Sequence, residues 1–106
     1  MVTILVILRM HLIKHKTLRQ FWERHPDAEQ PLREWYKTIK QGEWRSWQDV
    51  KAVFAALSVL KGNRLVFNIK GNKYRLVIQA DYRYKIFYVR FIGLHRDYDR
   101  IDANTI

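Results

Sequence analysis

The apolar residues of the chain change their spacing near residue 64, and this change divides the sequence into a helical half and a strand half. Before residue 64 they recur every three or four positions, which is typical of helices that bury one face. After it they alternate with polar residues, as in strands that bury one face. The pattern therefore predicts helices in the first part of the chain and strands in the second.

The first predicted elements are a short strand and a helix. The strand covers His11 to Ile13. Thr17 and Gln20 then have the spacing of a capping box, in which each side chain bonds a free backbone N–H at the start of a helix. His25-Pro26 ends this helix, because the residue before a proline avoids the helical conformation.

A second long helix and a third short one follow. Asp27 can cap the second helix, which ends near Gly42 and forms an antiparallel pair with the first. Ser46 and Asp49 predict a third helix that ends near Phe54. The residues expected to face the core from these three helices are Leu18, Phe21 and Trp22, then Leu32, Trp35, Tyr36 and Ile39, and finally Val50 and Phe54.

The strand half contains three strands, Arg64–Lys70, Tyr74–Ala80 and Lys85–Ile92, before a last turn or short helix over His95–Ile101. Gly71-Asn72 is a two-residue hairpin loop, and counting outward from it sets the first pairing. Residues opposite each other share a face of the sheet. The core face is predicted to hold Leu65, Phe67, Ile69, Tyr74, Leu76 and Ile78, and the other face Arg64, Val66, Asn68, Lys70, Lys73, Arg75, Val77 and Gln79.

The third strand is placed by alternation. Phe87, Val89 and Phe91 are assigned to the core face, which turns Ile86, Tyr88 and Arg90 to the polar face. A tight turn at Tyr82-Arg83 then sets Arg90 beside Arg75, and Arg75 beside Asn68. Two adjacent arginines repel each other unless an anion lies between them, so this row favours a phosphate-binding site.

The length and composition indicate one globular domain, which we place at residues 10–106. The chain has 106 residues, 48% of them hydrophobic, and no cysteine, which fits a reducing cytoplasm. Residues 1–9 form either an extension of the first strand or a misassigned start that precedes the true Met10. This apolar stretch is too short to cross a membrane and lacks the features of a signal peptide.

Basic charge is the strongest global feature. The net charge is +10, and residues 61–92 alone contain eight Lys and Arg against a single acid, interleaved with four tyrosines. Cations and aromatic rings in this mixture suit RNA, whose phosphates are neutralised while its bases stack on rings. A solvated charged face is the alternative.

The run from Val66 to Leu76 (Val-Phe-Asn-Ile-Lys-Gly-Asn-Lys-Tyr-Arg-Leu) resembles the signature of HigB-family toxins, which belong to the RelE-type superfamily. Phe91-Ile92-Gly93, His95 and Tyr98-Asp99 extend the resemblance, which covers residues 10–106. The family usually has Thr before the histidine of the last motif, where this chain has Leu94, so His95 is expected to be held differently.

The resemblance implies a RelE-like α+β fold, in which a small antiparallel sheet packs against two N-terminal helices. It also implies a toxin that cleaves mRNA in the ribosomal decoding site without a metal or other cofactor. The implied partners are mRNA on the ribosome and a HigA-like helix-turn-helix antitoxin, through which the toxin contacts DNA only indirectly. We expect Arg75 and Arg90 to stabilise the phosphorane, and His95 and Tyr98 to act as acid and base. The residues expected to bind RNA are Arg64, Asn68, Lys70, Lys73 and Tyr88.

Each assignment has an alternative. Tyr98 can be a core aromatic with its hydroxyl at the surface, and His95 can serve only a local hydrogen bond. Asp97 and Asp99 are expected to be solvated or paired with neighbouring arginines. For the whole chain, the alternatives are a non-catalytic module that binds RNA or the ribosome, and a toxin with another target such as gyrase.

Overall fold

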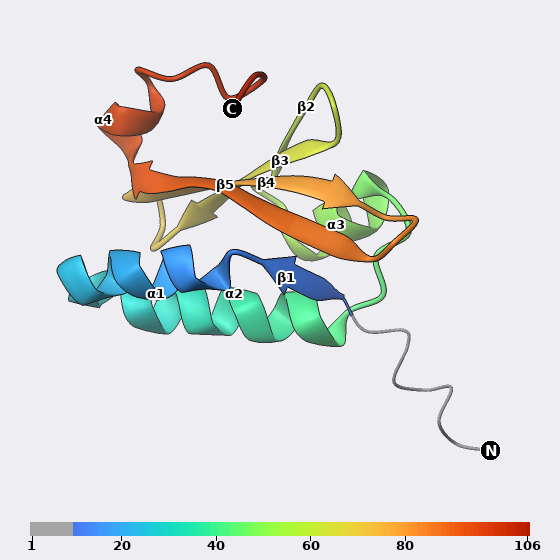
Figure 1. The fold of residues 1–106 in the computed structure, drawn as a ribbon, viewed down its shortest axis with the longest axis horizontal. Helices are drawn as coiled ribbons and strands as arrows, with labels where there is room; N and C mark the ends of the chain where they lie inside the picture. Colours follow the sequence, from blue (N-terminus) through green and yellow to red (C-terminus); the bar gives the residue numbers. More distant parts are fainter. Residues whose placement is uncertain (1–9) are drawn as a thin grey trace.

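The computed structural model describes residues 10–106, so the prediction for residues 1–9 lies outside the described residues. The fold is α+β, as predicted: a five-stranded sheet has two long helices on one face and a short C-terminal helix on the other (Figure 1). The elements are β1 (His11–Ile13), α1 (His15–Arg24), the 3-10 turn η2 (Pro26–Ala28), α2 (Glu29–Gln41), α3 (Trp47–Val53), β2 (Ser58–Leu60), β3 (Arg64–Ile69), β4 (Tyr74–Asp81), β5 (Ile86–Leu94) and α4 (His95–Tyr98).

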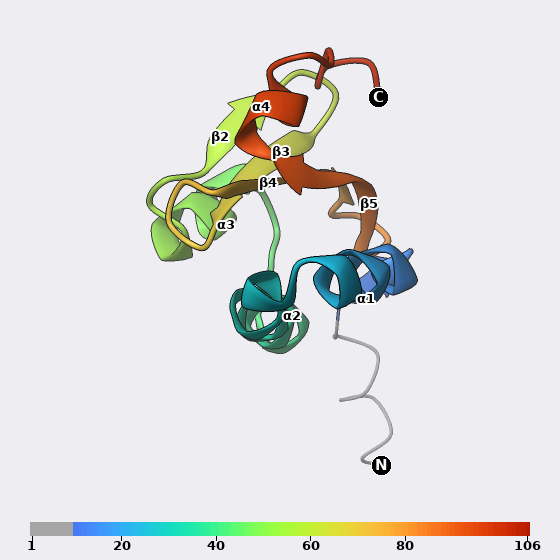
Figure 2. The same ribbon diagram turned by 90° about the vertical axis from the view of Figure 1, so that its left-hand side faces the viewer.

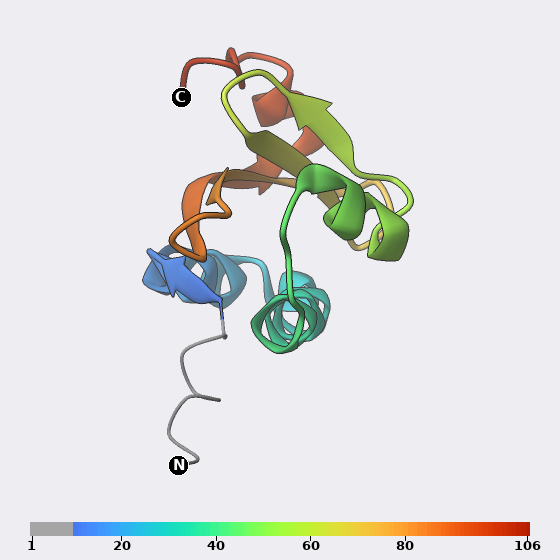
Figure 3. The ribbon, with the colours of Figure 1, turned by 90° about the vertical axis from the view of Figure 1, so that its right-hand side faces the viewer.

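The sheet has the strand order β1-β5-β4-β3-β2, and four of its strands pair antiparallel. β1 pairs parallel to β5 at one edge, a pairing that the sequence pattern did not specify. The sequence pattern also missed β2 at the opposite edge, because this strand has only three residues and its first two are exposed. α3 lies at the β2 end of the sheet, away from α1 (Figure 3).

The helices occupy the predicted ranges, but the predicted caps are wrong. α1 begins at His15, two residues before Thr17, and Lys14 leads into it in the left-handed conformation without a side-chain cap. Asp27 lies in η2, where its carboxylate accepts hydrogen bonds from Lys73 and Tyr74 instead of capping α2. Ser46 does not cap α3 with its side chain, although the Asp49 carboxylate accepts a hydrogen bond from the Arg45 backbone N–H just before the helix, at 2.9 Å.

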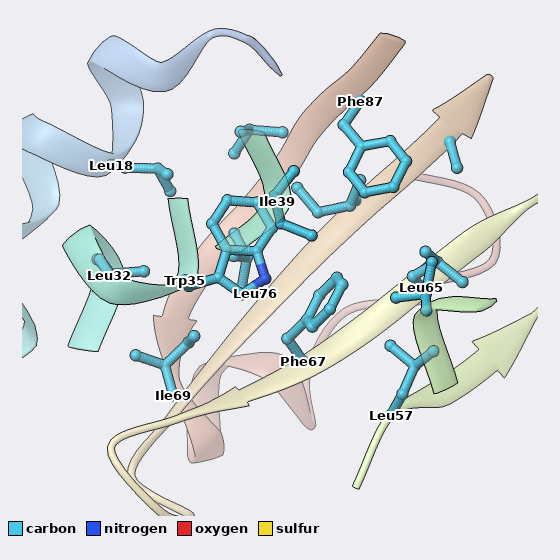
Figure 4. Close-up of a cluster of buried hydrophobic side chains, with 14 of the residues drawn as sticks. Leu18, Leu32, Trp35, Ile39, Leu57, Leu65, Phe67, Ile69, Leu76 and Phe87 are labelled. Atoms are coloured by element: carbon cyan, nitrogen blue, oxygen red, sulfur yellow. The ribbon is translucent and has the colours of Figure 1, made fainter. Parts of the chain in front are cut away.

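The predicted core face is confirmed for every strand residue assigned to it except Phe91. Side chains of the helical layer, including Trp35 and Ile39, pack against Phe67, Leu76 and Phe87 of the sheet (Figure 4). The Trp35 and Phe67 rings meet edge to face, with their centroids 5.3 Å apart. This contact joins α2 to the middle of the sheet.

The opposite face is covered at its centre. Val66 and Val77, which the alternation assigned to the polar face, are buried there in a second cluster with Ala103. Phe91 and Tyr98 pack against this cluster, so Phe91 lies on this face and not on the predicted core face. Figure 2 shows α4 and the C-terminal segment on this side of the sheet and α1 and α2 on the other.

Candidate functional site

Arg75 is the second residue of β4, next to the loop of the β3–β4 hairpin. The register of this hairpin is the predicted one, with Asn68 opposite Arg75. Lys70 and Gly71 adopt positive φ in the loop, and this turns the backbone so that Asn72 faces Arg75. The Arg75 Nη2 donates to Asn72 Oδ1 at 2.5 Å, and Nη1 donates to the Asn72 carbonyl at 3.3 Å. The guanidinium is therefore fixed at the hairpin end of the sheet, where it remains half-exposed.

His95 begins α4 at the same end of the sheet. Its backbone N–H donates to the Lys73 carbonyl at 3.2 Å, which ties α4 to the hairpin. Its Nδ1 lies 3.1 Å from Asp99 Oδ2, and a bond there leaves Nε2 to exchange a proton with a ligand. Leu94 gives α4 no side-chain cap and packs against the main core, opposite Tyr74.

Tyr98 follows His95 by one helical turn. It is half-buried, and its ring packs against Phe91 with the centroids 6.4 Å apart. This contact anchors α4 on the second cluster. Tyr98 is thus partly a packing residue, as the alternative allowed, and it shares the short helix with His95.

Arg90 does not lie beside Arg75, which corrects the predicted row. Gly93 is the β5 partner of Arg75, because the turn between β4 and β5 spans residues 82–85 and a bulge interrupts the pairing after Val77. At about 3.3 Å per strand residue, Arg75 and Arg90 are separated by roughly 10 Å along β5. Arg90 Nε and Nη2 donate to Gln79 Oε1 at 3.0 and 2.5 Å, on the side away from the hairpin.

A separate cavity lies beside Arg90 on this face of the sheet. This cavity has a volume of about 700 Å³ and is lined by polar and aromatic side chains, among them Tyr88, Arg83 and Gln79. The Arg90 guanidinium lies over the Tyr88 ring, 5.7 Å from its centroid. The structure thus brings Arg75, His95 and Tyr98 to one end of the face and places Arg90 and Tyr88 further along it.

Two residues expected to bind RNA form hydrogen bonds with other residues of the protein. Lys73 Nζ donates to Asp27 Oδ2 at 2.5 Å, so Lys73 turns toward the helical layer and not, as predicted, toward the polar face. The bond from Lys73 lowers the pKa of Asp27, and the same bond raises the pKa of Lys73. Arg64 donates from Nε and Nη2 to the backbone oxygen of Ile106, at 3.1 and 2.8 Å. Asn68 and Lys70 are exposed.

A family model described as HigB toxin, the RelE-like toxic component of a toxin–antitoxin system, matches residues 28–101. The chain is also 33% identical over 96 residues to the mRNA interferase toxin HigB of Escherichia coli (strain K12), an alignment that covers 89% of this chain and 92% of that protein. The chain belongs to the HigB toxin family. The mRNA interferase HigB of Shigella flexneri has the same identity and coverage. A third relative, the mRNA interferase HigB of Escherichia coli O6:H1, is 23% identical over 94 residues.

Sequence reasoning about this HigB-family toxin missed the residues that hold the candidate side chains Arg75 and His95. Asp99 was expected to be solvated or paired with an arginine, although its spacing of four from His95 is the spacing at which helical residues meet. Asn72 was interpreted only as a loop residue. Within residues 10–106 no three His, Cys, Asp or Glu gather into a possible metal site, and no helix is long and apolar enough to cross a membrane.

Proposed function

We propose that this HigB-family toxin is an mRNA interferase that cleaves mRNA on the ribosome in the cytoplasm. One observation carries the proposal: a fixed arginine, Arg75, and a carboxylate-paired histidine, His95, lie at the same end of a basic sheet face. Guanidinium groups stabilise charge on phosphate oxygens, and an imidazole can give or take a proton as a general acid or base. The names of the curated relatives support the choice of mRNA as the substrate.

The chemistry needs no group outside the chain and the RNA. The ribose 2′-oxygen loses its proton and attacks the adjacent phosphorus, while the bond from phosphorus to the 5′-oxygen breaks and that oxygen gains a proton. The products are a 2′,3′-cyclic phosphate and a 5′-hydroxyl. His95 Nε2 and the Tyr98 hydroxyl exchange these two protons, and Arg75 stabilises the extra negative charge of the phosphorane.

Arg90 and Tyr88 hold the same RNA strand at a second position. Their separation from Arg75 places them too far away to share one phosphate in this arrangement, and the cavity beside them accommodates a neighbouring nucleotide. A cation over an aromatic ring offers both a phosphate contact and a stacking surface. Asn68 and Lys70, exposed at the hairpin, complete the contacts at the Arg75 end.

The proposed partner is a HigA-like antitoxin with a helix-turn-helix domain, which blocks the toxin and links it to operator DNA. The family description supports an antitoxin partner. The net charge of +10 also suits both partners, because it attracts RNA and acidic protein surfaces alike.

Induction of the wild-type toxin and of Arg75→Ala and His95→Gln variants in cells tests this function. We expect the wild type to arrest protein synthesis with new mRNA ends inside coding regions. Both variants should bind ribosomes but cleave too slowly to arrest protein synthesis. Equal toxicity of all three proteins would refute catalysis and leave a binding module. Arrest of DNA synthesis before protein synthesis would indicate a gyrase-directed toxin.

A further inference from the structure

The Asp27 carboxylate joins two layers of the molecule that are distant in sequence. It lies in the η2 turn between the two long helices, and it accepts bonds from Lys73 Nζ at 2.5 Å and from the Tyr74 hydroxyl. Both donors lie where the hairpin enters β4, 46 and 47 residues away along the chain. The turn that ends α1 is thereby tied to the hairpin.

Tyr74 links the Asp27 contact to Arg75 on the opposite face of the sheet. Its side chain is 1% exposed and points into the core, where its ring meets Phe21 edge to face with a centroid distance of 5.2 Å. His25 packs against the same ring at 5.7 Å. Because neighbouring strand residues point to opposite faces, fixing Tyr74 on the core side also fixes Arg75 on the other side.

Lys73 links Asp27 to α4 through its backbone. Its carbonyl accepts the His95 N–H at 3.2 Å, and Tyr74 pairs with Leu94, the residue just before His95. Holding Lys73 and Tyr74 therefore holds the start of α4, which carries His95 and Tyr98.

We propose that Asp27 is a positioning residue of the active site, which acts through Lys73 and Tyr74 to keep Arg75 and His95 in place for RNA cleavage. This inference rests on the proposed function of the site. Asp27 itself belongs to the helical layer, with its carboxylate turned toward the hairpin, and it acts without touching the RNA or the reacting atoms. Its loss alters the geometry for catalysis and releases a lysine that can only favour RNA binding.

The Asp27→Asn variant tests the proposal against Glu29→Gln, a matched control. Glu29 lies two residues further on and bonds Arg33 at 2.7 Å, away from the hairpin. Asp27→Asn is expected to lower kcat for mRNA cleavage by about tenfold to a hundredfold, the effect of a small misplacement of catalytic groups, with KM unchanged or lower. Glu29→Gln should match the wild type in both constants.

Amide hydrogen exchange gives a second measurement that does not depend on cleavage. In Asp27→Asn the His95 amide should exchange faster, while amides in the middle of β4 keep wild-type rates. Lys73→Met, which removes the same ion pair from the other side, should reproduce this pattern even where Asp27→Asn folds poorly. Lys73→Met should also leave the β4 amides protected.

The outcomes are distinguishable. Wild-type protein that leaves mRNA intact would overturn the proposed function, while the exchange pattern would still decide whether Asp27 positions His95. If Asp27→Asn equals Glu29→Gln in kcat and in exchange, the positioning role is wrong. If exchange rises uniformly and activity falls in proportion to the folded fraction, Asp27 serves stability alone, which also overturns the proposal.

Discussion

At the scale of single residues, three of the side chains proposed to act on RNA are each held by a polar neighbour. Asn72 holds the Arg75 guanidinium, Asp99 lies against His95, and Gln79 holds Arg90. Each of these partners leaves part of the side chain free, so a phosphate or a reacting oxygen can still be bound. Geometry fixed in advance in this way lowers the cost of organising charge during the reaction.

Arg75→Lys tests whether the planar guanidinium is needed. We expect kcat to fall at least about tenfold, because an ammonium cannot bind two phosphate oxygens side by side while keeping the Asn72 contact. The free energy of unfolding should change by less than about 0.5 kcal/mol, as for most exposed substitutions. Single-turnover cleavage and urea unfolding measure the two effects. Arg24→Lys, at the exposed end of α1, is the control and should cleave like the wild type.

Tyr82 supplies a prediction about stability and pH. Within residues 10–106 its buried hydroxyl has no hydrogen-bond partner, and burial raises the pKa of Tyr82 to about 12. The folded protein disfavours the ionised phenol. Titration of Tyr82 therefore costs no free energy of unfolding below pH 10, the pKa in the unfolded chain, and lowers that free energy as the pH rises toward 12.

We therefore expect Tyr82→Phe to raise the free energy of unfolding at pH 7 by about 1 kcal/mol and to reduce the loss at alkaline pH. Urea unfolding between pH 7 and pH 11 measures both. Tyr84→Phe is the matched control, because the Tyr84 side chain is 63% exposed and should change neither quantity. A loss of stability in Tyr82→Phe would show that the hydroxyl has a partner in solution.

At the scale of elements, the sequence predicted what local rules determine. The register of the β3–β4 hairpin was predicted correctly, since a two-residue loop and two alternating strands define it. The position of Arg90 was wrong because it depends on a four-residue turn and a bulge, and alternation reveals neither. The helix caps failed for another reason: tertiary contacts take Asp27 away from α2.

The polar face shows the same limit. On their own face of the sheet, Val66 and Val77 lie between polar residues of β3 and β4, so alternation assigned them to an exposed face. They are buried because the C-terminal segment returns over the sheet. Of the site residues, Arg75 was placed correctly by its hairpin. The Asp99 contact needed the helical turn of α4, which the sequence indicated only as a turn or short helix.

Gly93 tests how closely β5 and α4 pack. A Cβ added at Gly93 would lie 2.6 Å from Phe91 Cζ, so Gly93→Ala must displace the ring on which Tyr98 rests. We expect a loss of about 1–3 kcal/mol in the free energy of unfolding and a fall in cleavage. Adding Phe91→Leu removes the clashing ring atom and should restore part of the stability. If Gly93→Ala behaves like the wild type, the ring is free to move.

At the scale of the whole molecule, the two faces of the sheet have different roles. The helix-covered face supplies the main core and the Asp27 contact, and the other face presents the site at one end and the Arg90 cavity at the other. The Val77–Phe91 pair and the segment around Ala103 fill the space between these two ends. An RNA strand bound to both ends must therefore pass over or around this covered centre.

This separation predicts how Arg75 and Arg90 combine. If each holds a different phosphate, the effects of Arg75→Ala and Arg90→Ala on kcat/KM should add within about 0.5 kcal/mol in the double variant, as for residues more than about 7–10 Å apart. If both hold one phosphate, as their predicted adjacency required, the double variant should lose much less than the sum. Arg75→Ala should act mainly on kcat, because it loses charge stabilisation in the transition state, and Arg90→Ala mainly on KM. A coupling energy above about 1 kcal/mol would show that RNA binding brings the two guanidinium groups together, and that the bulge in β5 rearranges when substrate binds.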